Sequence, residues 1–239
     1  MIDVHAHILP AMDDGAKDVP TSVAMLKMLA EQGVTDVIAT PHFNPRYNDS
    51  IEQFLTYRER SYKELSYRIA GRNDLPRIRL GAEATVCVDM AKFPDIGKLC
   101  IEGTRYILTE IDIRSFGDWF YNTVFEIRTK HDIIPIIAHI DRYIGILRSR
   151  TIIKILELGC VVQFNASAFL NGAVRRKLIP LIQQYPDQIC LVGSDCHNTG
   201  TRKPQFDKFV QKADKYMGEG FLNYIEKRSK MLLEGKLIY

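Results

Sequence analysis

Residues 133–140 read IIPIIAHI, an apolar run interrupted only by His139 near its end. A strand exposed on one face alternates apolar and polar residues, whereas a strand covered on both faces is apolar almost throughout. Six further runs of β-branched and apolar residues are similar to it, at 2–7, 34–42, 77–86, 105–111, 160–166 and 189–195. The sequence therefore predicts seven buried strands, of the kind found in parallel sheets.

Segments with helical spacing of apolar residues separate these strands. Val23, Leu26 and Leu29, for example, recur along one helix face before Gly33 ends the segment. The predicted helices cover 20–32, 50–70, about 90–101, 118–131, 145–158, 171–185 and 204–234. Because strands and helices alternate and no linker divides the chain, we expect one α/β domain over residues 1–239. Seven such units close into a barrel or lie open as a doubly wound sheet, but the glycine motifs of nucleotide-binding sheets are absent.

The composition is that of an ordinary globular protein, with 46% hydrophobic and 26% charged residues and a net charge of +3. This small and mixed charge predicts neither nucleic-acid binding nor membrane attachment. No apolar stretch approaches the roughly 20 residues that span a bilayer, and the N-terminus lacks a signal-peptide pattern. Five cysteines without a CxxC pair are expected to be buried, reduced thiols of a cytoplasmic protein: Cys87, Cys100, Cys160, Cys190 and Cys196.

Metal-capable side chains fall at the carboxyl ends of the predicted strands. In a parallel barrel these ends meet on one face, where barrel enzymes carry their chemistry. Five of the six histidines occupy such positions, and only His131 lies in a helical stretch. A single such histidine would be interpreted as a hydrogen-bonded core residue, but five together indicate a common site. With the carboxylates at strand ends, the candidate ligands are His5, His7, His42, Glu83, Glu110, His139, Asp195 and His197.

Strand periodicity strengthens this interpretation. Residues at i and i+2 project to the same side, so His5 and His7 point together, and Cys196 should point away from its neighbours. Imidazole nitrogens and carboxylate oxygens suit zinc, manganese or iron. Asp14, in the loop after the first strand, adds a carboxylate, although Asp13 competes with it for that role. The set is too large for one tetrahedral ion and suits two or three ions that share a bridging carboxylate.

Such multi-metal sites hydrolyse phosphate esters. Arg142 and Arg202 follow His139 and His197 in loops on the same face, and guanidinium groups bind phosphate. The alternative for each arginine is a solvated surface position. Four aromatic residues near this face either stack on an aromatic substrate or merely anchor loops. They are Phe43, Tyr47, Phe116 and Trp119.

Five ordered segments, DVHAH, TPH, GAE, AHIDR and GSDCH, resemble the motifs of the polymerase and histidinol phosphatase (PHP) superfamily. The opening MIDVHAHILPAMDDG, with ATPH after the second strand, is similar to the manganese-dependent protein-tyrosine phosphatases within it. The resemblance implies a distorted (β/α)7 barrel of the TIM type. It also implies hydrolysis of phosphotyrosine on a bacterial tyrosine kinase that regulates capsule and exopolysaccharide synthesis.

The same resemblance implies a centre of three ions, manganese with iron or zinc as alternatives. The first ion would take His5, His7, Glu83 and Asp195. Glu83 would bridge to a second ion that Glu110 and His139 also hold. The third ion would take Asp14, His42 and His197.

Catalytic roles are expected for Arg142 and Arg202, which would hold the phosphoryl group, and for Asp14 as a candidate general acid. A competing hypothesis is that the enzyme is a histidinol-phosphate phosphatase or another small-molecule phosphomonoesterase on the same scaffold. A hypothesis of a different class is a metal-binding regulatory module that has lost its catalytic activity.

Overall fold

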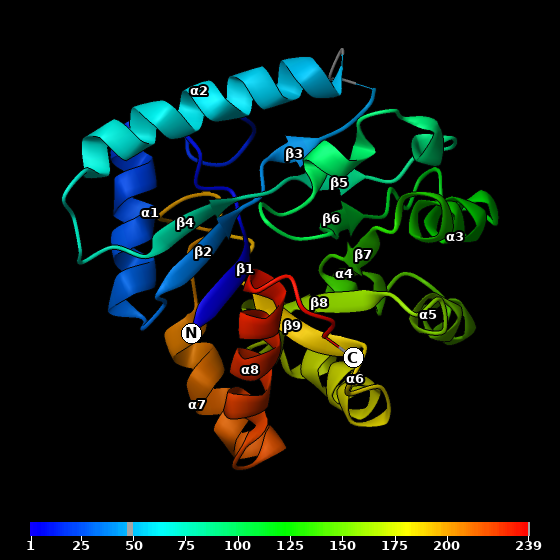
Figure 1. Cartoon of the computed structure of the whole chain (residues 1–239). Coiled ribbons are helices and arrows are strands. Elements are labelled where there is room, and N and C mark those ends of the chain that lie inside the picture. Colours follow the sequence, from blue (N-terminus) through cyan, green and yellow to red (C-terminus); the bar gives the residue numbers. More distant parts are fainter. Residues whose placement is uncertain (47–49, 239) are drawn as a thin grey trace.

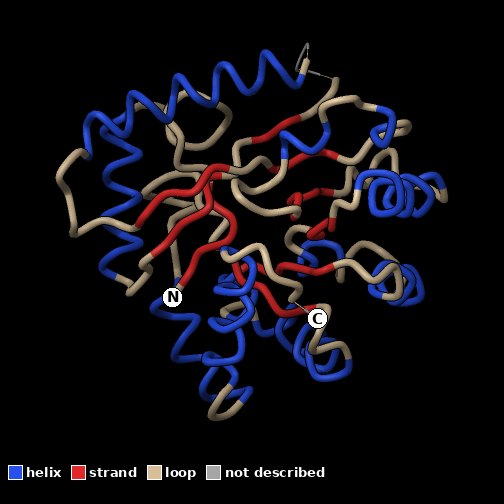
Figure 2. The backbone as a smooth tube through the Cα atoms, in the orientation of Figure 1, coloured by secondary structure: helices blue, strands red, loops and turns tan. Residues whose placement is uncertain are grey.

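Parallel strands form the centre of the computed structural model, which describes residues 1–46 and 50–238 (Figures 1 and 2). A small sheet has the order β1-β2-β4, and a larger sheet has the order β3-β5-β6-β7-β8-β9. Every strand pair in both sheets is parallel, as the apolar runs predict. The strands are β1 (Ile2–Ala6), β2 (Asp36–Ala39), β3 (His42–Phe43), β4 (Arg77–Leu80), β5 (Glu83–Thr85), β6 (Tyr106–Glu110), β7 (Ile134–Ile137), β8 (Val161–Asn165) and β9 (Ile189–Gly193).

Two of the predicted strands are each divided between the two sheets. The run 34–42 forms β2 in the small sheet and β3 in the large one, and the run 77–86 forms β4 and β5. Pro41 lacks a backbone N–H and marks the first crossing. Gly81 marks the second, where a Cβ atom would lie 3.2 Å from Ile38. The prediction of single long strands at these places was wrong.

The two sheets meet again at the carboxyl ends of β1 and β9. The amide of Asp195 donates to the His5 carbonyl at 2.8 Å, and Ala6 forms an isolated parallel bridge with Cys196. The strand pairing among the described residues leaves two sheets, without one closed sheet. The predicted α/β architecture is therefore confirmed, while the strand pairing does not confirm a closed barrel.

The helices lie outside the strands, with α2 across the top of Figure 1 and α6 to α8 at the bottom. Their bounds are α1 (Val19–Glu31), α2 (Ile51–Ile69), α3 (Trp119–His131), α4 (Ile140–Tyr143), α5 (Ser149–Leu156), α6 (Gly172–Gln184), α7 (Phe206–Met217) and α8 (Phe221–Leu233). One predicted helix, 204–234, is interrupted by Gly218 and Gly220, whose φ angles are 81° and 93°. Another, at about 90–101, is replaced by two 3-10 turns on either side of Pro94.

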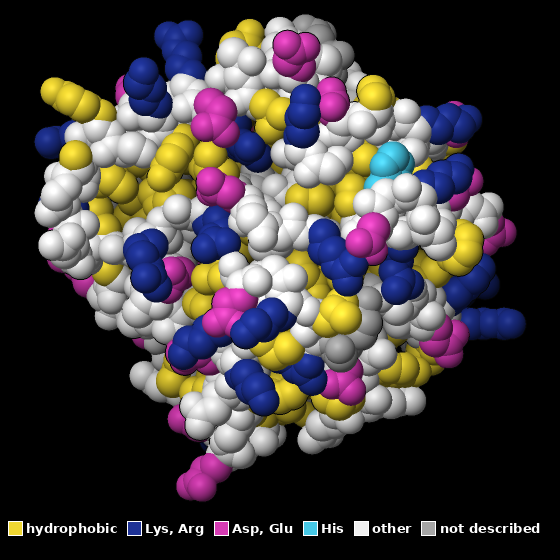
Figure 3. Space-filling model, in the orientation of Figure 1, with side chains coloured by type: hydrophobic (Ala, Val, Ile, Leu, Met, Phe, Trp, Pro, Cys, Tyr) yellow, Lys and Arg dark blue, Asp and Glu magenta, His cyan; other side chains and the backbone are white. Residues whose placement is uncertain are grey.

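No helix in the described parts of the chain is both long enough and apolar enough to cross a membrane. On the face shown in Figure 3, lysine and arginine side chains alternate with aspartate and glutamate. All five cysteines are free thiols. Cys160, Cys190 and Cys196 are buried as expected, but Cys87 and Cys100 are only half-buried, so the prediction of five buried thiols was wrong for these two.

Candidate metal centre

Glu83 is the centre of the candidate site. It begins β5, and its side chain is buried. Its Oε2 atom lies 3.1 Å from His5 Nε2, 3.2 Å from His7 Nε2 and 3.2 Å from His42 Nδ1. Its Oε1 atom lies 2.8 Å from His139 Nε2. One carboxylate thus reaches four of the predicted ligands, which come from three other strands: His5 and His7 lie at the end of β1 and just after it, His42 begins β3, and His139 follows β7.

The charges in this cluster compensate one another. Burial would raise the pKa of Glu83, but the charge of His5 and the hydrogen bond with His139 hold the pKa well below its usual range. Burial would lower the pKa of His7, but the hydrogen bond and charge of Asp13 together with Glu83 raise it to about 10. The site therefore attracts positive charge at the point where the imidazole nitrogens meet.

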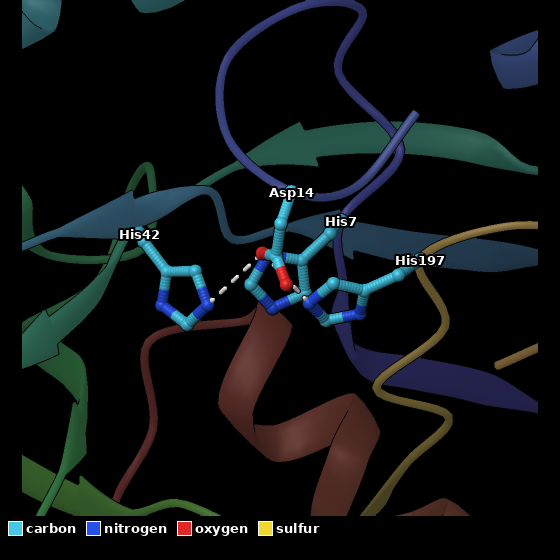
Figure 4. Close-up of side chains that lie close together, drawn as sticks. All are labelled: His7, Asp14, His42 and His197. Carbon is cyan, nitrogen blue, oxygen red and sulfur yellow. Dashed lines mark ion pairs between the residues drawn. The ribbon is translucent and has the colours of Figure 1, made fainter. Parts of the chain in front are cut away.

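Asp14 forms a second group with three histidines. Its Oδ1 atom lies 3.5 Å from His42 Nε2 and 3.3 Å from His197 Nε2, so that it stands between the two rings in Figure 4. The ring of His7 stacks on the ring of His197 with centroids 3.8 Å apart. Burial and the nearby charge of His7 lower the pKa of His197 to about 4, which favours the neutral imidazole that a metal requires.

Asp13 has a different environment from Asp14. Its Oδ2 atom lies 2.7 Å from His7 Nδ1 and accepts a hydrogen bond from the backbone N–H of His42 at 2.9 Å. Its Oδ1 atom accepts from the N–H of Gly15 at 2.9 Å. Such a carboxylate fixes the ring of a ligating histidine and leaves the other nitrogen free. The two neighbouring aspartates therefore separate, with Asp13 behind His7 and Asp14 among the ring nitrogens.

Glu110 and Asp195 complete the cluster, each beside a different pair of histidines. Glu110, the last residue of β6, lies 3.7 Å from His42 Nδ1 and 4.0 Å from His139 Nε2. The hydroxyl of Thr85 donates to it at 2.7 Å. Asp195 Oδ1 lies 3.7 Å from the Nε2 atoms of both His5 and His7.

The two predicted arginines lie at the rim of the cluster. Arg142 contacts Asp195 Oδ2, and Arg202 contacts Asp195 Oδ1 at 3.1 Å and Asp14 Oδ2 at 3.2 Å. Burial would raise the pKa of Asp195, but its proximity to His5 and Arg142 lowers it to about 2. Both arginine side chains remain more than a third exposed, so an anion that approaches the site from solvent can reach them.

The donor atoms fit divalent metal ions. Three sets of potential ligands have donor atoms within 4.8 Å of one another: His7, Asp14, His42 and His197; His5, His7 and Glu83; and His42, Glu83 and Glu110. Glu83 Oε2 is buried and close to three ring nitrogens, yet it makes no aligned hydrogen bond among the described residues. An orphaned carboxylate oxygen is costly unless a cation is shared. Nitrogen and oxygen donors without sulfur suit manganese, iron or zinc.

The backbone at this site is held in uncommon conformations. His139 has a φ angle of 35° and Asp195 one of 51°, values that favour glycine and persist where function demands them. Two glycines allow close approach to the ligand-bearing strand. A Cβ atom on Gly15 would lie 2.5 Å from His7 Cβ, and one on Gly193 would lie 2.5 Å from His5 Cβ.

The aromatic residues considered for substrate stacking are used mainly in packing. Phe43 is buried against Phe54 with ring centroids 5.3 Å apart, and the indole N–H of Trp119 donates to the Ser115 carbonyl at 2.8 Å. Phe116 packs against Phe120 and Tyr121, with ring centroids 5.3 and 5.8 Å apart. Tyr47 lies outside the described residues. The structure favours the loop-anchoring interpretation for the three that it describes.

Two uncharged residues that the sequence does not mark as metal ligands also lie in the site. Gln163 and Asn165 of β8 are buried and contact candidate ligands from three elements. Sequence reasoning assigned their strand but found no charged or imidazole side chain in it, so they were missed. Their alternation at i and i+2 was the only available sign.

Comparison with known proteins gives consistent results. A family model described as capsular polysaccharide synthesis, CpsB/CapC, matches residues 1–233. The tyrosine-protein phosphatase YwqE of Bacillus subtilis is 27% identical, with 100% of this chain and 94% of the relative covered. The tyrosine-protein phosphatase CpsB of Streptococcus pneumoniae is 26% identical, with 85% and 86% covered.

Solved structures show the same similarity. One solved structure matches this chain with a TM-score of 0.81. It is described among crystal structures of YwqE from Bacillus subtilis and CpsB from Streptococcus pneumoniae, unique metal-dependent tyrosine phosphatases. It is 26% identical and covers 100% of this chain and 96% of its own. A histidinol phosphate phosphatase from Lactococcus lactis has a TM-score of 0.60 at 13% identity, with 90% and 92% covered, and shares the fold.

Proposed function

The chain belongs to the CpsB/CapC family of capsular polysaccharide synthesis proteins, and we propose that it is a metal-dependent protein-tyrosine phosphatase. The observation that carries the proposal is the buried Glu83 carboxylate, which four histidine side chains approach within 3.2 Å. Relatives that cover the whole chain are tyrosine phosphatases, and one is described as metal-dependent. Together these support hydrolysis of phosphotyrosine in a protein.

We assign the ligands to three ions as follows. His5, His7, Glu83 and Asp195 would hold the first, Glu83, Glu110 and His139 would hold the second, and Asp14, His42 and His197 would hold the third. Manganese is the proposed metal, with iron and zinc as alternatives that the same donors accept. When bound, such ions supply a hydroxide nucleophile near neutral pH and neutralise the oxygens of the phosphoryl group.

The chain's own residues bind and orient the substrate. Arg142 and Arg202, which contact Asp195 at the rim of the cluster, would bind the phosphoryl oxygens, since guanidinium groups bind phosphate in a bidentate manner. Water is added at phosphorus and the bond from phosphorus to the tyrosyl oxygen breaks. The leaving phenol has a pKa of about 10, so its oxygen ends protonated. A water beside Asp14 would supply this proton while Asp14 is bound to the third ion, and Asp14 itself could supply it only if its carboxyl group were protonated and not a ligand.

The same proposal extends to partners and setting. The substrate is a phosphotyrosine-bearing protein, for which a bacterial tyrosine kinase of capsule or exopolysaccharide synthesis is proposed. Residues 1–239 act as one PHP-type domain, a distorted (β/α)7 barrel whose pairing is opened at the two strand crossings. Five free thiols suit the cytoplasm.

The test is a comparison of kcat/KM on a phosphotyrosine peptide and on histidinol phosphate, before and after metal removal. We expect the peptide to be preferred, activity to vanish after chelation, and manganese to restore it. Preference for histidinol phosphate would favour a small-molecule phosphomonoesterase. Bound metal without turnover of any phosphoester would favour a regulatory module.

Two histidine variants make the test specific to the cluster. His5→Gln should lose more than about 100-fold in activity, because even residues behind a ligand cost 10–100-fold. His131→Gln is the matched control, since His131 lies outside the cluster and contacts the Ala91 carbonyl at 2.7 Å. Equal activity of the two variants would contradict the proposal.

A further inference from the structure

Strand β8 contributes none of the proposed metal ligands, yet it passes beside them. Its residues Gln163 and Asn165 stand at i and i+2 and therefore project to the same side. Both are buried, with 0% and 4% of their surface exposed. Buried amides are costly unless their polar atoms are hydrogen-bonded, so their partners indicate what they do.

The orientation of the Gln163 amide follows from the backbone of His139. The His139 N–H donates to Gln163 Oε1 at 2.7 Å, which identifies that atom as the oxygen. The same oxygen lies 3.2 Å from His5 Nδ1. An oxygen only accepts, so the His5 ring must carry its hydrogen on Nδ1. In the neutral ring, Nε2 then has a free lone pair, and this atom faces Glu83 Oε2 and His7 Nε2 at 3.1 Å each.

His7 has the same arrangement. Its Nδ1 atom points to Asp13 at 2.7 Å, which leaves its Nε2 lone pair toward His5 Nε2. Two imidazole lone pairs 3.1 Å apart repel each other unless a positive charge lies between them or one ring is protonated. The amide of Gln163 and the carboxylate of Asp13 thus prepare two rings to share a cation.

Hydrogen bonds continue from Gln163 to Asp195, another proposed ligand of the same ion. Gln163 Nε2 donates to Asn165 Oδ1 at 3.0 Å, and Asn165 Nδ2 donates to Asp195 Oδ2 at 3.1 Å. From His5 to Asp195 every bond runs in one direction, and such chains polarise one another in a dry interior. With Oδ2 so engaged, Asp195 Oδ1 is the oxygen that lies toward His5 and His7.

We propose that Gln163 and Asn165 are positioning residues that form one relay between His5 and Asp195. The relay holds His5 in the tautomer with a free Nε2 and fixes the rotamer of Asp195, so that both ligands present to one ion. The inference rests on the metal centre of the proposed function, but it adds two residues and a role that the ligand set does not contain.

The test measures manganese binding by the metal-stripped, full-length chain, from the loss of the electron paramagnetic resonance signal of free Mn²⁺. Gln163→Met keeps the approximate size of the side chain but removes both the oxygen that accepts from His5 and the N–H group that donates to Asn165. Gln163→Glu keeps the acceptor for His5 but removes the donor to Asn165. Thr109→Val is the matched control, because it removes a buried hydrogen bond to the Ile136 carbonyl within the same sheet.

We expect Gln163→Met to weaken binding of at least one ion about 10–100-fold, the range for residues that orient metal ligands. Gln163→Glu should recover at least tenfold of that loss, and Thr109→Val should bind as the wild type does. Wild-type binding by Gln163→Met would overturn the proposal. So would equal losses in Gln163→Met and Gln163→Glu, or in Gln163→Met and Thr109→Val, since these indicate packing alone.

If Gln163→Met does not fold, Asn165→Leu decides, because it removes the donor to Asp195 and the acceptor for Gln163 Nε2 but leaves the contact between Gln163 and His5 in place. Weaker manganese binding by this variant supports the relay, and wild-type binding refutes it. Failure of the wild-type chain to bind manganese would refute the metal centre itself. That outcome is distinct from normal wild-type binding with unaffected variants, which refutes the relay alone.

Discussion

Gly193, the last residue of β9, decides how closely that strand can approach the ligand-bearing strand β1. A Cβ atom added there would lie 2.5 Å from His5 Cβ, 3.0 Å from Gln163 Nε2 and 3.2 Å from the His5 backbone nitrogen. Nonbonded carbon atoms prefer about 3.5–4.0 Å. Gly193→Ala therefore requires β1 and β9 to separate by roughly 1.0–1.5 Å at His5, by subtraction of the first distance from that range.

This displacement should affect both stability and metal binding. Overpacking of a buried position costs about 1–3 kcal/mol, and a functional site tolerates only about 0.5 Å of misplacement. We expect Gly193→Ala to lose about 1–3 kcal/mol in urea unfolding of the metal-free chain, and to bind manganese more weakly. Alanine at this position adds no backbone strain, because the φ angle of Gly193 is not among the positive ones.

Gly145→Ala is the matched control, since a Cβ atom on Gly145 would meet nothing within 4 Å. It should unfold and bind manganese as the wild type does. If Gly193→Ala matched Gly145→Ala in both the free energy of unfolding and the manganese affinity, the close approach of β9 to His5 would not be what shapes the site.

Three further predictions concern single side chains. Asp14→Asn should lose bound manganese, counted by metal analysis, whereas Asp13→Asn should keep the ions but bind them about 10–100-fold more weakly; the reverse order would exchange their roles. Arg202→Ala should lower kcat/KM on a phosphotyrosine peptide about 10²–10³-fold, the cost of one charge-stabilising donor, with manganese stoichiometry unchanged; unchanged kinetics would remove Arg202 from the mechanism. Arg58→Met should cost about 1–3 kcal/mol in urea unfolding, because it removes the buried hydrogen bond to the Gly81 carbonyl at 2.9 Å; a wild-type unfolding midpoint would contradict this.

Much of the fold was predictable because burial on both faces of a sheet leaves a clear mark in the sequence. The apolar runs located the strands, and the crossing points were the exception. At Pro41 and Gly81 the chain passes from one sheet to the other without leaving the extended conformation, so the apolar pattern continues across the break. The break between α7 and α8 was marked in the sequence by Gly218 and Gly220. The helical spacing of apolar residues on both sides of these glycines led to the prediction of one continuous helix.

The candidate ligands were predictable for a similar reason, since histidines at strand ends stand out among apolar neighbours. Their supporting partners were not. Gln163 and Asn165 are uncharged, and only the three-dimensional arrangement of β1, β7, β8 and β9 reveals what they contact. Asp13 and Asp14 are adjacent carboxylates, and their spacing alone does not tell which one faces the ring nitrogens.

The proposed trinuclear centre can be observed directly by anomalous X-ray scattering from crystals of the manganese-loaded chain. The structure predicts manganese peaks around Glu83, with His5, His7 and Asp195 on one side, Glu110 and His139 on another, and Asp14, His42 and His197 at a third. Peaks found only away from Glu83, or their absence after loading with manganese, would contradict the account.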